Sequence, residues 1–318
     1  MQVGLSTCTF VDTTRTTYDY ATHQLLPYRR LVTDIFYPTT EGGRVSPARL
    51  APPAYRRGPF PLVLFAHGFA VDPMTYAPLL DAWVKAGFVV AAPIFPDTNQ
   101  AAVRAAHGLG EADMTNQPGD VAFVANQLRA AMNGQSSTCA FVRGLIKPGP
   151  IAAAGQSDGA DTVAALAYWH AAAGLLAGLD LKAVEVLSGA ELDDTVGAYG
   201  AAPGGPAMLM VQSEYDTCNT PQSAATLYDA VAQPDKWFLM TTATTHLGPY
   251  DGREPTYFSF VVRATTAFLD AELKGGSPSS ALEHAAAGAT GLVALTEGGS
   301  APAMPSLTFD RASCFVDR

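Results

Sequence analysis

One serine in the chain has the neighbours that an activated nucleophile needs. Ser157 stands between Gly155 and Gly159, where the apolar residues 150–154 predict a short buried strand and residues 160–173 predict a helix. The turn between them is so tight that a Cβ at either glycine would meet the neighbouring strand or helix. A serine in such a strand–turn–helix presents its hydroxyl at the end of a sheet. We therefore predict that Ser157 is a nucleophile.

A serine hydroxyl also needs a base to take its proton and a third group to orient that base. Asp216 comes five residues after the predicted strand 207–211, and His246 comes just after the predicted strand 236–241. The chain order serine, acid, histidine is the one expected when each group follows a strand of a parallel sheet. We predict that Asp216 is the orienting carboxylate and that His246 is the general base.

Other residues compete for these two roles. Asp193 and Asp194 follow the preceding strand, a position that sometimes supplies the acid, and Glu214 is a close neighbour of Asp216. His67 follows a buried strand, and we expect it to be structural rather than a second base. The other histidines lack a position at a strand end: His23, His107, His170 and His284.

Attack on a carbonyl would also require donors for the negative oxygen that forms. The backbone N–H of Asp158, directly after the serine, is one expected donor. The second is the backbone N–H of Phe69, in the turn that follows His67-Gly68. We predict that these two groups form an oxyanion hole.

Short apolar strands alternate with helices along most of the chain, which predicts an α/β fold with one doubly wound, mostly parallel sheet and helices on both faces. Strands are expected at 2–11, 30–37, 61–66, 88–92, 150–154, 181–187, 207–211, 236–241 and 292–296. Helices are expected at 75–86, from about 118 to 134, and at 160–173, 224–231 and 255–274, with a small one after 277. The connection 94–117 is expected to be a long loop. We expect a single domain over 1–318, with a tail from about 297.

Composition excludes several classes of partner. The 318 residues are 48% hydrophobic, which supports a sizeable core, and the net charge of −10 argues against a nucleic-acid partner. No apolar run approaches the roughly 20 residues that span a bilayer. We expect a monomer that acts on a small or polymeric substrate without a cofactor.

Four cysteines occur at unrelated spacings: Cys8, Cys139, Cys218 and Cys314. They show no metal-binding pattern, and no metal is expected. Either two disulfides, with three connectivities open, or a few buried thiols would fit. Because Met1-Gln2-Val3 begins directly on strand-like sequence, the chain is either cytoplasmic or secreted with its signal peptide removed. We favour the secreted alternative.

With these residues placed, the sequence resembles bacterial α/β-hydrolase esterases related to platelet-activating-factor acetylhydrolases and dienelactone-hydrolase-like proteins, and also the cutinase-type polyester hydrolases. The likeness spans about residues 1–296. It rests on the segments 63–69, 116–121, 155–159, 216–217 and 263–269. The resemblance implies a serine carboxylic-ester hydrolase that acts on short-chain or polymeric esters, poly(ethylene terephthalate) included. A lipid acetyl-ester hydrolase, an amidase or peptidase, a perhydrolase and a catalytically silent binding protein are the alternatives.

The sequence also departs from the pattern of that family. The residues around the serine are Gln156 and Asp158, where the family usually has histidine and a bulky apolar residue. The tryptophan that polyester hydrolases place before the acid is absent from 188–192. The substrate-binding residues that the resemblance implies are Phe69, Gln156, Leu192 and Leu247.

Overall fold

The computed structural model describes residues 1–41, 46–193, 195, 197–200, 205–242, 245–289, 291–310 and 314. Its strands are β1 (Gln2–Asp12), β2 (Thr17–Asp19), β3 (Gln24–Leu26), β4 (Arg29–Thr39), β5 (Ala48–Arg49), β6 (Leu62–Ala66), β7 (Val89–Ile94), β8 (Ile151–Gln156), β9 (Leu181–Leu187), β10 (Ala207–Ser213), β11 (Lys236–Thr241) and β12 (Val293–Glu297). Its α-helices are α1 (Ala77–Ala86), α2 (Gln100–Ala105), α3 (Gln117–Met132), α4 (Asp158–Tyr168), α5 (Pro221–Ala230), α6 (Gly248–Asp251), α7 (Pro255–Lys274) and α8 (Pro278–Ala286).

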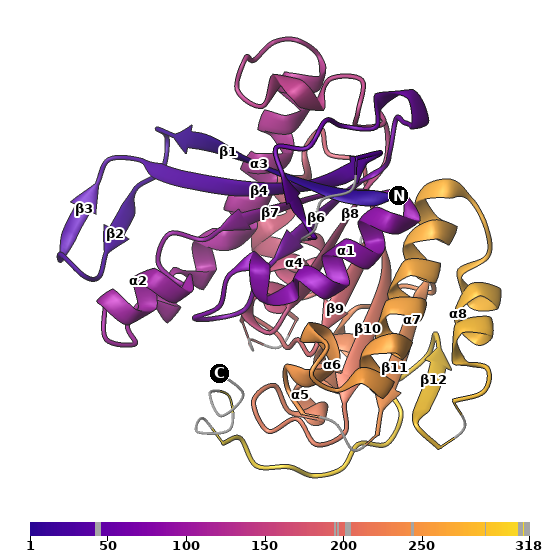
Figure 1. Ribbon diagram of the computed structural model, residues 1–318. Coiled ribbons are helices and arrows are strands. Elements are labelled where there is room, and N and C mark those ends of the chain that lie inside the picture. Colours follow the sequence, from indigo (N-terminus) through magenta and orange to yellow (C-terminus); the bar gives the residue numbers. More distant parts are fainter. Residues whose placement is uncertain are drawn as a thin grey trace.

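Ten strands form one sheet in the order β12-β11-β10-β9-β8-β6-β7-β4-β1-β5 (Figure 1). The six central strands, from β11 to β7, all run parallel. Antiparallel pairs flank them, with β12 on β11 at one side and β4 on β7 at the other. The predicted mostly parallel sheet is therefore confirmed. Because the central strands are parallel, the loops after β6, β8, β10 and β11 all lie at one edge of the sheet.

The sheet is buried on both faces, which explains why its central strands read as continuous apolar runs. On one face α3, α4 and α5 pack through residues such as Leu128, Val163 and Leu227. On the other face α1 and α7 pack through residues such as Trp83 and Phe268. The predicted doubly wound arrangement, with helices on both faces, is thus confirmed.

The segment 94–117, expected to be a loop, contains two helical segments. Helix α2 begins after Asn99, whose side chain accepts a hydrogen bond from the backbone N–H of Ala102. A 3₁₀ helix, η3 (Glu111–Asn116), leads directly into α3. Helix α2 has six residues, and Val103 alone among them is buried, so it leaves no apolar periodicity in the sequence.

An ion-pair cluster fixes this segment to the sheet. Arg29 of β4, fully buried, donates from Nε and Nη2 to the carboxylate of Asp120 at 2.8 and 2.6 Å. Its Nη1 and Nη2 also reach the carboxylate of Asp113 at 2.8 Å each. Burial alone would lower the pKa of Arg29, but these two carboxylates raise it, so the guanidinium stays charged. The cluster holds η3 and the start of α3 against β4.

Two disulfides are present, Cys8–Cys139 and Cys218–Cys314. The second joins the loop after β10 to the C-terminal segment, which passes below α5 in Figure 1 after it leaves β12. The backbone N–H of Asp310 also donates to the carbonyl of Thr217 at 2.9 Å. The C-terminal segment is therefore attached to the loop that carries Asp216.

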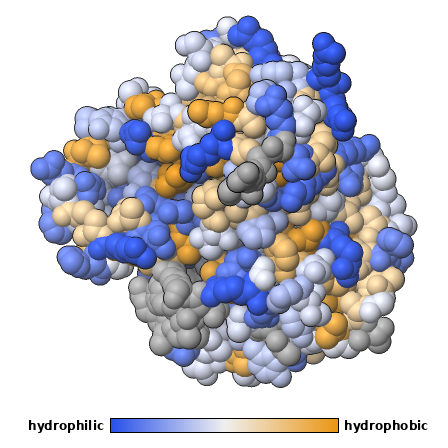
Figure 2. Space-filling view, in the orientation of Figure 1, coloured by the Kyte–Doolittle hydropathy of each residue, from blue (hydrophilic) through white to orange (hydrophobic). Residues whose placement is uncertain are grey.

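The face of the molecule shown in Figure 2 has hydrophobic residues in several separate areas with hydrophilic residues between them. This fits a chain whose large apolar side chains mostly pack against the sheet. Among the described residues, no helix combines the length and apolar character needed to span a membrane. No three potential ligands among their His, Cys, Asp and Glu side chains are grouped so as to hold a metal ion.

Candidate active site

Ser157 occupies the sharp turn between β8 and α4 that the sequence predicts. Its backbone has φ 58° and ψ −130°, a strained conformation for a residue other than glycine. A Cβ at Gly155 would collide with the carbonyl oxygen of Gly159, and a Cβ at Gly159 would collide with the carbonyl oxygen of Ala66 on β6. The two glycines thus permit the close approach of strand, turn and helix that aims Ser157 out of the sheet.

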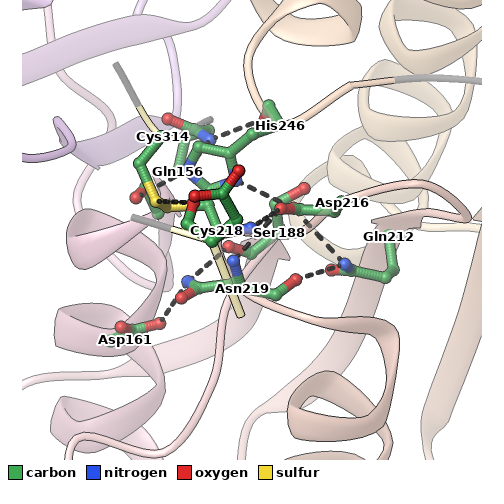
Figure 3. Close-up of a disulfide and its surroundings, with 11 residues drawn as sticks. Gln156, Asp161, Ser188, Gln212, Asp216, Cys218, Asn219, His246 and Cys314 are labelled. Carbon is green, nitrogen blue, oxygen red and sulfur yellow. Dashed lines mark hydrogen bonds and ion pairs between the residues drawn. A yellow bond between two sulfur atoms is a disulfide. The ribbon is translucent and has the colours of Figure 1, made fainter. Parts of the chain in front are cut away.

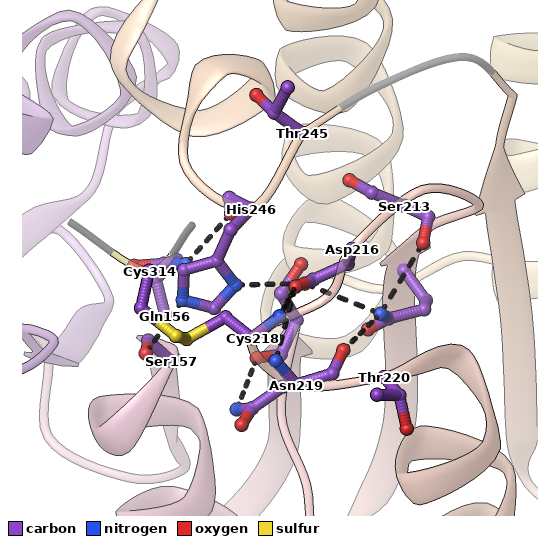
Figure 4. A network of polar contacts seen from close by, with 12 residues as sticks. Gln156, Ser157, Ser213, Asp216, Cys218, Asn219, Thr220, Thr245, His246 and Cys314 are labelled. Carbon is purple, nitrogen blue, oxygen red and sulfur yellow. Dashed lines mark hydrogen bonds and ion pairs between the residues drawn. A yellow bond between two sulfur atoms is a disulfide. The ribbon is translucent and has the colours of Figure 1, made fainter. Parts of the chain in front are cut away.

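Three side chains from separate loops meet at this edge of the sheet (Figure 4). The Oγ of Ser157 lies 2.8 Å from Nε2 of His246, and Nδ1 of His246 lies 2.8 Å from Oδ2 of Asp216. Asp216 is fully buried, while Ser157 is 7% exposed and His246 is 9% exposed. The structure therefore brings together the three residues to which the sequence assigns nucleophile, base and acid.

The carboxylate of Asp216 accepts hydrogen bonds at both oxygens. Its Oδ1 accepts the backbone N–H groups of Cys218 at 2.8 Å and Asn219 at 3.1 Å. Its Oδ2 accepts from Nδ1 of His246 and from Nε2 of Gln212 at 3.4 Å. Asp216 therefore acts as a hydrogen-bond acceptor at both oxygens. When Nδ1 of His246 donates to this carboxylate, Nε2 is the ring nitrogen that can accept the proton of the serine.

Asn219 connects the loop after β10, which carries Asp216, to α4, the helix that follows Ser157 (Figure 3). Its Nδ2 donates to the carbonyl of Ser188 at 2.8 Å and to Oδ1 of Asp161 at 3.3 Å. The same Oδ1 accepts the backbone N–H of Ala190 at 2.6 Å. Burial raises the pKa of Asp161 well above its usual range, and the charges of Asp158 and Asp216 raise it further. Sequence reasoning missed this bridge, because no local pattern marks residues 58 positions apart.

The loop of His246 has an anchor of its own. Oε1 of Glu254 accepts from the hydroxyl of Thr245 at 2.6 Å and from its backbone N–H at 3.2 Å. Glu254 lies immediately before α7, so this anchor ties the residue preceding His246 to a long packed helix. The imidazole is consequently held from its own loop as well as by Asp216.

The loop after β6 brings a backbone segment beside the serine. His67 is fully buried and uses both ring nitrogens, since Nδ1 lies 2.8 Å from the carbonyl of Gly68 and Nε2 accepts the backbone N–H of Phe95 at 3.1 Å. Burial lowers the pKa of His67 to about 4, so the ring is neutral at neutral pH. These contacts agree with the structural role predicted for His67.

Hydrogen bonds on either side of Phe69 fix the course of its backbone. The N–H of Gly68 donates to the hydroxyl of Tyr76 at 3.2 Å, and the N–H of Ala70 donates to the carbonyl of Thr98 at 2.7 Å. Asp158 is the first residue of α4, where N–H groups point toward the start of the helix. The two predicted oxyanion donors thus lie on a braced loop and at a helix start, and their role stays a prediction.

The four predicted substrate-binding residues have different environments. Phe69 packs with Ala70 and Val103 in a small buried cluster. Leu192 is partly buried, and its backbone N–H donates to the hydroxyl of Tyr199. Leu247 is 7% exposed and belongs to the buried cluster that contains residues of α1 and α7, and its role at the substrate site stays a prediction.

Gln156 is 1% exposed, its amide hydrogen-bonds to the hydroxyl of Tyr76 and to the carbonyl of His246, and its role toward a substrate stays a prediction. Among the competing acids, Asp193 accepts the backbone N–H of Thr195 at 3.0 Å, and Asp194 lies outside the described residues. Nδ1 of His246 pairs with Asp216.

No family model matches the sequence, and no curated protein matches it. Among solved structures, the chain is similar to that of a ferulic acid esterase from Streptomyces cinnamoneus, with a TM-score of 0.63 and 17% sequence identity. The likeness covers 93% of this chain and 96% of that chain. At this identity the comparison establishes the fold, and the α/β-hydrolase fold expected from the sequence is confirmed.

Proposed function

We propose that the chain is a serine carboxylic-ester hydrolase that works through an acyl-enzyme. The observation that carries the proposal is the continuous chain of contacts from Oγ of Ser157 through the imidazole of His246 to the carboxylate of Asp216, with 2.8 Å at each step. The base His246 contacts the hydroxyl of Ser157, and the buried carboxylate of Asp216 orients the imidazole. This arrangement makes a serine hydroxyl nucleophilic.

The reaction begins when Oγ of Ser157 attacks the ester carbonyl while Nε2 of His246 takes its proton. The ionised Asp216 stabilises the imidazolium that forms, and the backbone N–H groups of Phe69 and Asp158 stabilise the negative oxygen of the tetrahedral intermediate. The imidazolium then gives its proton to the leaving alcohol, and the C–O bond breaks. Water, activated by the same base, attacks the acyl-enzyme and regenerates Ser157.

The substrates that we propose are short-chain or polymeric esters, as for a cutinase-like polyester hydrolase. The solved structure with the same fold is named for ferulic acid esterase activity, which supports testing an ester of an aromatic acid as well. We also propose that the protein is secreted, because its two disulfides require an oxidising compartment to form and persist.

The test is a panel of p-nitrophenyl esters from acetate to palmitate, together with methyl ferulate and a polyester film. Ser157→Ala is the inactive variant, and Ser137→Ala, which removes an exposed hydroxyl in the loop after α3, is the matched control. We expect wild type and the control to hydrolyse at least the short esters and Ser157→Ala to fall to background. Equal activity of wild type and Ser157→Ala would refute the proposal.

A further inference from the structure

A buried row of hydrogen bonds joins the three loops that meet at Ser157. The backbone N–H of Gly68 donates to the hydroxyl of Tyr76 at 3.2 Å, and that hydroxyl donates to Oε1 of Gln156 at 2.7 Å. Nε2 of Gln156 then donates to the backbone carbonyl of His246 at 3.0 Å. Tyr76 is fully buried and Gln156 is 1% exposed, so water does not compete for these bonds.

The chemistry of the partners fixes the orientation of the Gln156 amide. The carbonyl of His246 can only accept, so it must face the NH₂ group. The hydroxyl of Tyr76 accepts the N–H of Gly68 and therefore donates its own proton to the amide oxygen. A side chain at position 156 must thus accept at one end and donate at the other, which glutamine does and an apolar residue of the same length does not.

The second face of that NH₂ group lies close to the reacting atoms. Nε2 of Gln156 is 3.4 Å from Nε2 of His246, the atom that takes the proton of Ser157. Gln156 therefore holds the backbone of His246 through one N–H of its amide. The second N–H faces the ring nitrogen of His246 that contacts Ser157.

The other end of the row sets the distance between the loop after β6 and the nucleophile. A Cβ at Gly68 would lie 3.1 Å from Cβ of Ser157, 3.1 Å from Oη of Tyr76 and 3.2 Å from the carbonyl oxygen of Gln156. The backbone at Gly68 is therefore in tight contact with the serine elbow, the sharp turn of residues 155–159 between β8 and α4. The next residue is Phe69, whose N–H is a proposed oxyanion donor. A displacement of this loop by a fraction of an ångström would change the distance from that donor to the reacting oxygen.

We propose that Gln156 and Tyr76 are positioning residues. They fix the loop after β6, the serine elbow and the imidazole of His246 relative to one another. The inference rests on the proposed ester hydrolysis and deepens it. Both residues act through Phe69 and His246 rather than on the substrate. Their loss should therefore weaken transition-state stabilisation while leaving ground-state binding unchanged.

Two variants remove the row of hydrogen bonds and leave most of the packing. Tyr76→Phe deletes only the hydroxyl and keeps the ring in its edge contact with Phe65, 4.9 Å between centroids. Gln156→Met keeps the length of the side chain and removes both polar ends. The matched control is Tyr228→Phe, which also deletes a buried hydroxyl with backbone partners, at Lys236 and Gly298, near the start of β11 and away from the triad.

We expect each variant to lower kcat on p-nitrophenyl butyrate about 10- to 100-fold and to change KM by no more than about twofold. The affinity for a trifluoromethyl ketone, which forms a tetrahedral adduct with the serine, should weaken in proportion to kcat/KM. Because the two residues act in one row of hydrogen bonds, the kcat of the double variant should be no more than about threefold below that of the less active single variant. Tyr228→Phe should keep wild-type kcat even where its melting temperature falls.

Values of kcat for Tyr76→Phe and Gln156→Met within about twofold of wild type, with Ser157→Ala inactive, would overturn the inference and leave the proposed function intact. So would losses that follow melting temperature alone, with the control equally affected. If wild type hydrolyses no ester, or if Ser157→Ala is as active as wild type, the proposed function itself fails.

Discussion

The substitution Asp216→Asn tests the orienting carboxylate with almost no change in volume. Both oxygens of Asp216 face donors: the backbone N–H groups of Cys218 and Asn219 at Oδ1, and Nδ1 of His246 with Nε2 of Gln212 at Oδ2. An asparagine has one acceptor and one NH₂ group, so one of the two sides must lose its acceptor.

The structure decides which side that is. The backbone N–H groups of Cys218 and Asn219 cannot reverse their polarity, whereas His246 can move its proton from Nδ1 to Nε2. We therefore expect the oxygen of the asparagine to stay with the two backbone donors and its NH₂ group to face Nδ1. The imidazole would then carry its proton on Nε2, where it donates to Ser157 instead of accepting from it.

A base in the wrong tautomer should lower kcat about 10⁴-fold, equivalent to about 5.4 kcal/mol, with KM little changed. Asp216→Ala leaves both tautomers accessible, so it should retain at least as much activity as Asp216→Asn despite losing more atoms. Stopped-flow measurement of p-nitrophenol release gives kcat, and ¹⁵N NMR of the imidazole gives the tautomer. An Asn variant with more than about a tenth of wild-type kcat, or with its proton still on Nδ1, would refute this reasoning.

Three further perturbations address stability. Glu185 on β9 is fully buried, neither of its carboxyl oxygens has a hydrogen-bond partner among the described residues, and burial raises its pKa well above 4.5. As pH rises, the unfolded chain releases this proton before the folded chain does. The free energy of unfolding of Glu185→Leu should therefore rise relative to wild type by about 1.4 kcal/mol per pH unit above about 4.5, up to the folded-state pKa. A difference that does not change with pH in urea titrations would contradict this. Burial, and then repulsion by Asp113, raises the pKa of Asp97 to about 7. The free energy of unfolding of Asp97→Asn should therefore rise relative to wild type between about pH 4 and about pH 7 and no further. A difference that keeps growing above about pH 8 would count against that pKa. Cys218→Ser removes a bond between cysteines that are 96 positions apart in the sequence, so it should lower the free energy of unfolding by about 2–4 kcal/mol. Unchanged stability would show that the Cys218–Cys314 bond constrains little.

The site was readable from the sequence where local pattern and topology act together. The serine elbow is marked within five residues, because only glycine fits at the positions two before and two after Ser157. Asp216 and His246 follow from the parallel sheet, since the loops after successive strands meet at one edge. Their contact is thus predictable without any knowledge of side-chain packing.

Features that depend on long-range polar contacts were not predictable. Gln156 finds its partners 80 and 90 residues away, and Arg29 finds its partners 84 and 91 residues away, with nothing local to indicate either. The pairing Cys8–Cys139 and Cys218–Cys314 was one of three possibilities that spacing alone left open. The hairpin of β2 and β3 has three residues in each strand, too few to show an alternating pattern.

Covalent labelling by diethyl p-nitrophenyl phosphate tests the central claim most directly, because an activated serine displaces p-nitrophenolate from this phosphate ester far faster than an ordinary hydroxyl does. The account predicts release of one p-nitrophenolate per chain, loss of ester hydrolysis in step with it, and a phosphoryl adduct on the peptide that contains Ser157. Ser157→Ala should release none, and His246→Ala should react far more slowly. An adduct on another residue, or equal labelling of wild type and Ser157→Ala, would contradict the assignment of Ser157 as the nucleophile.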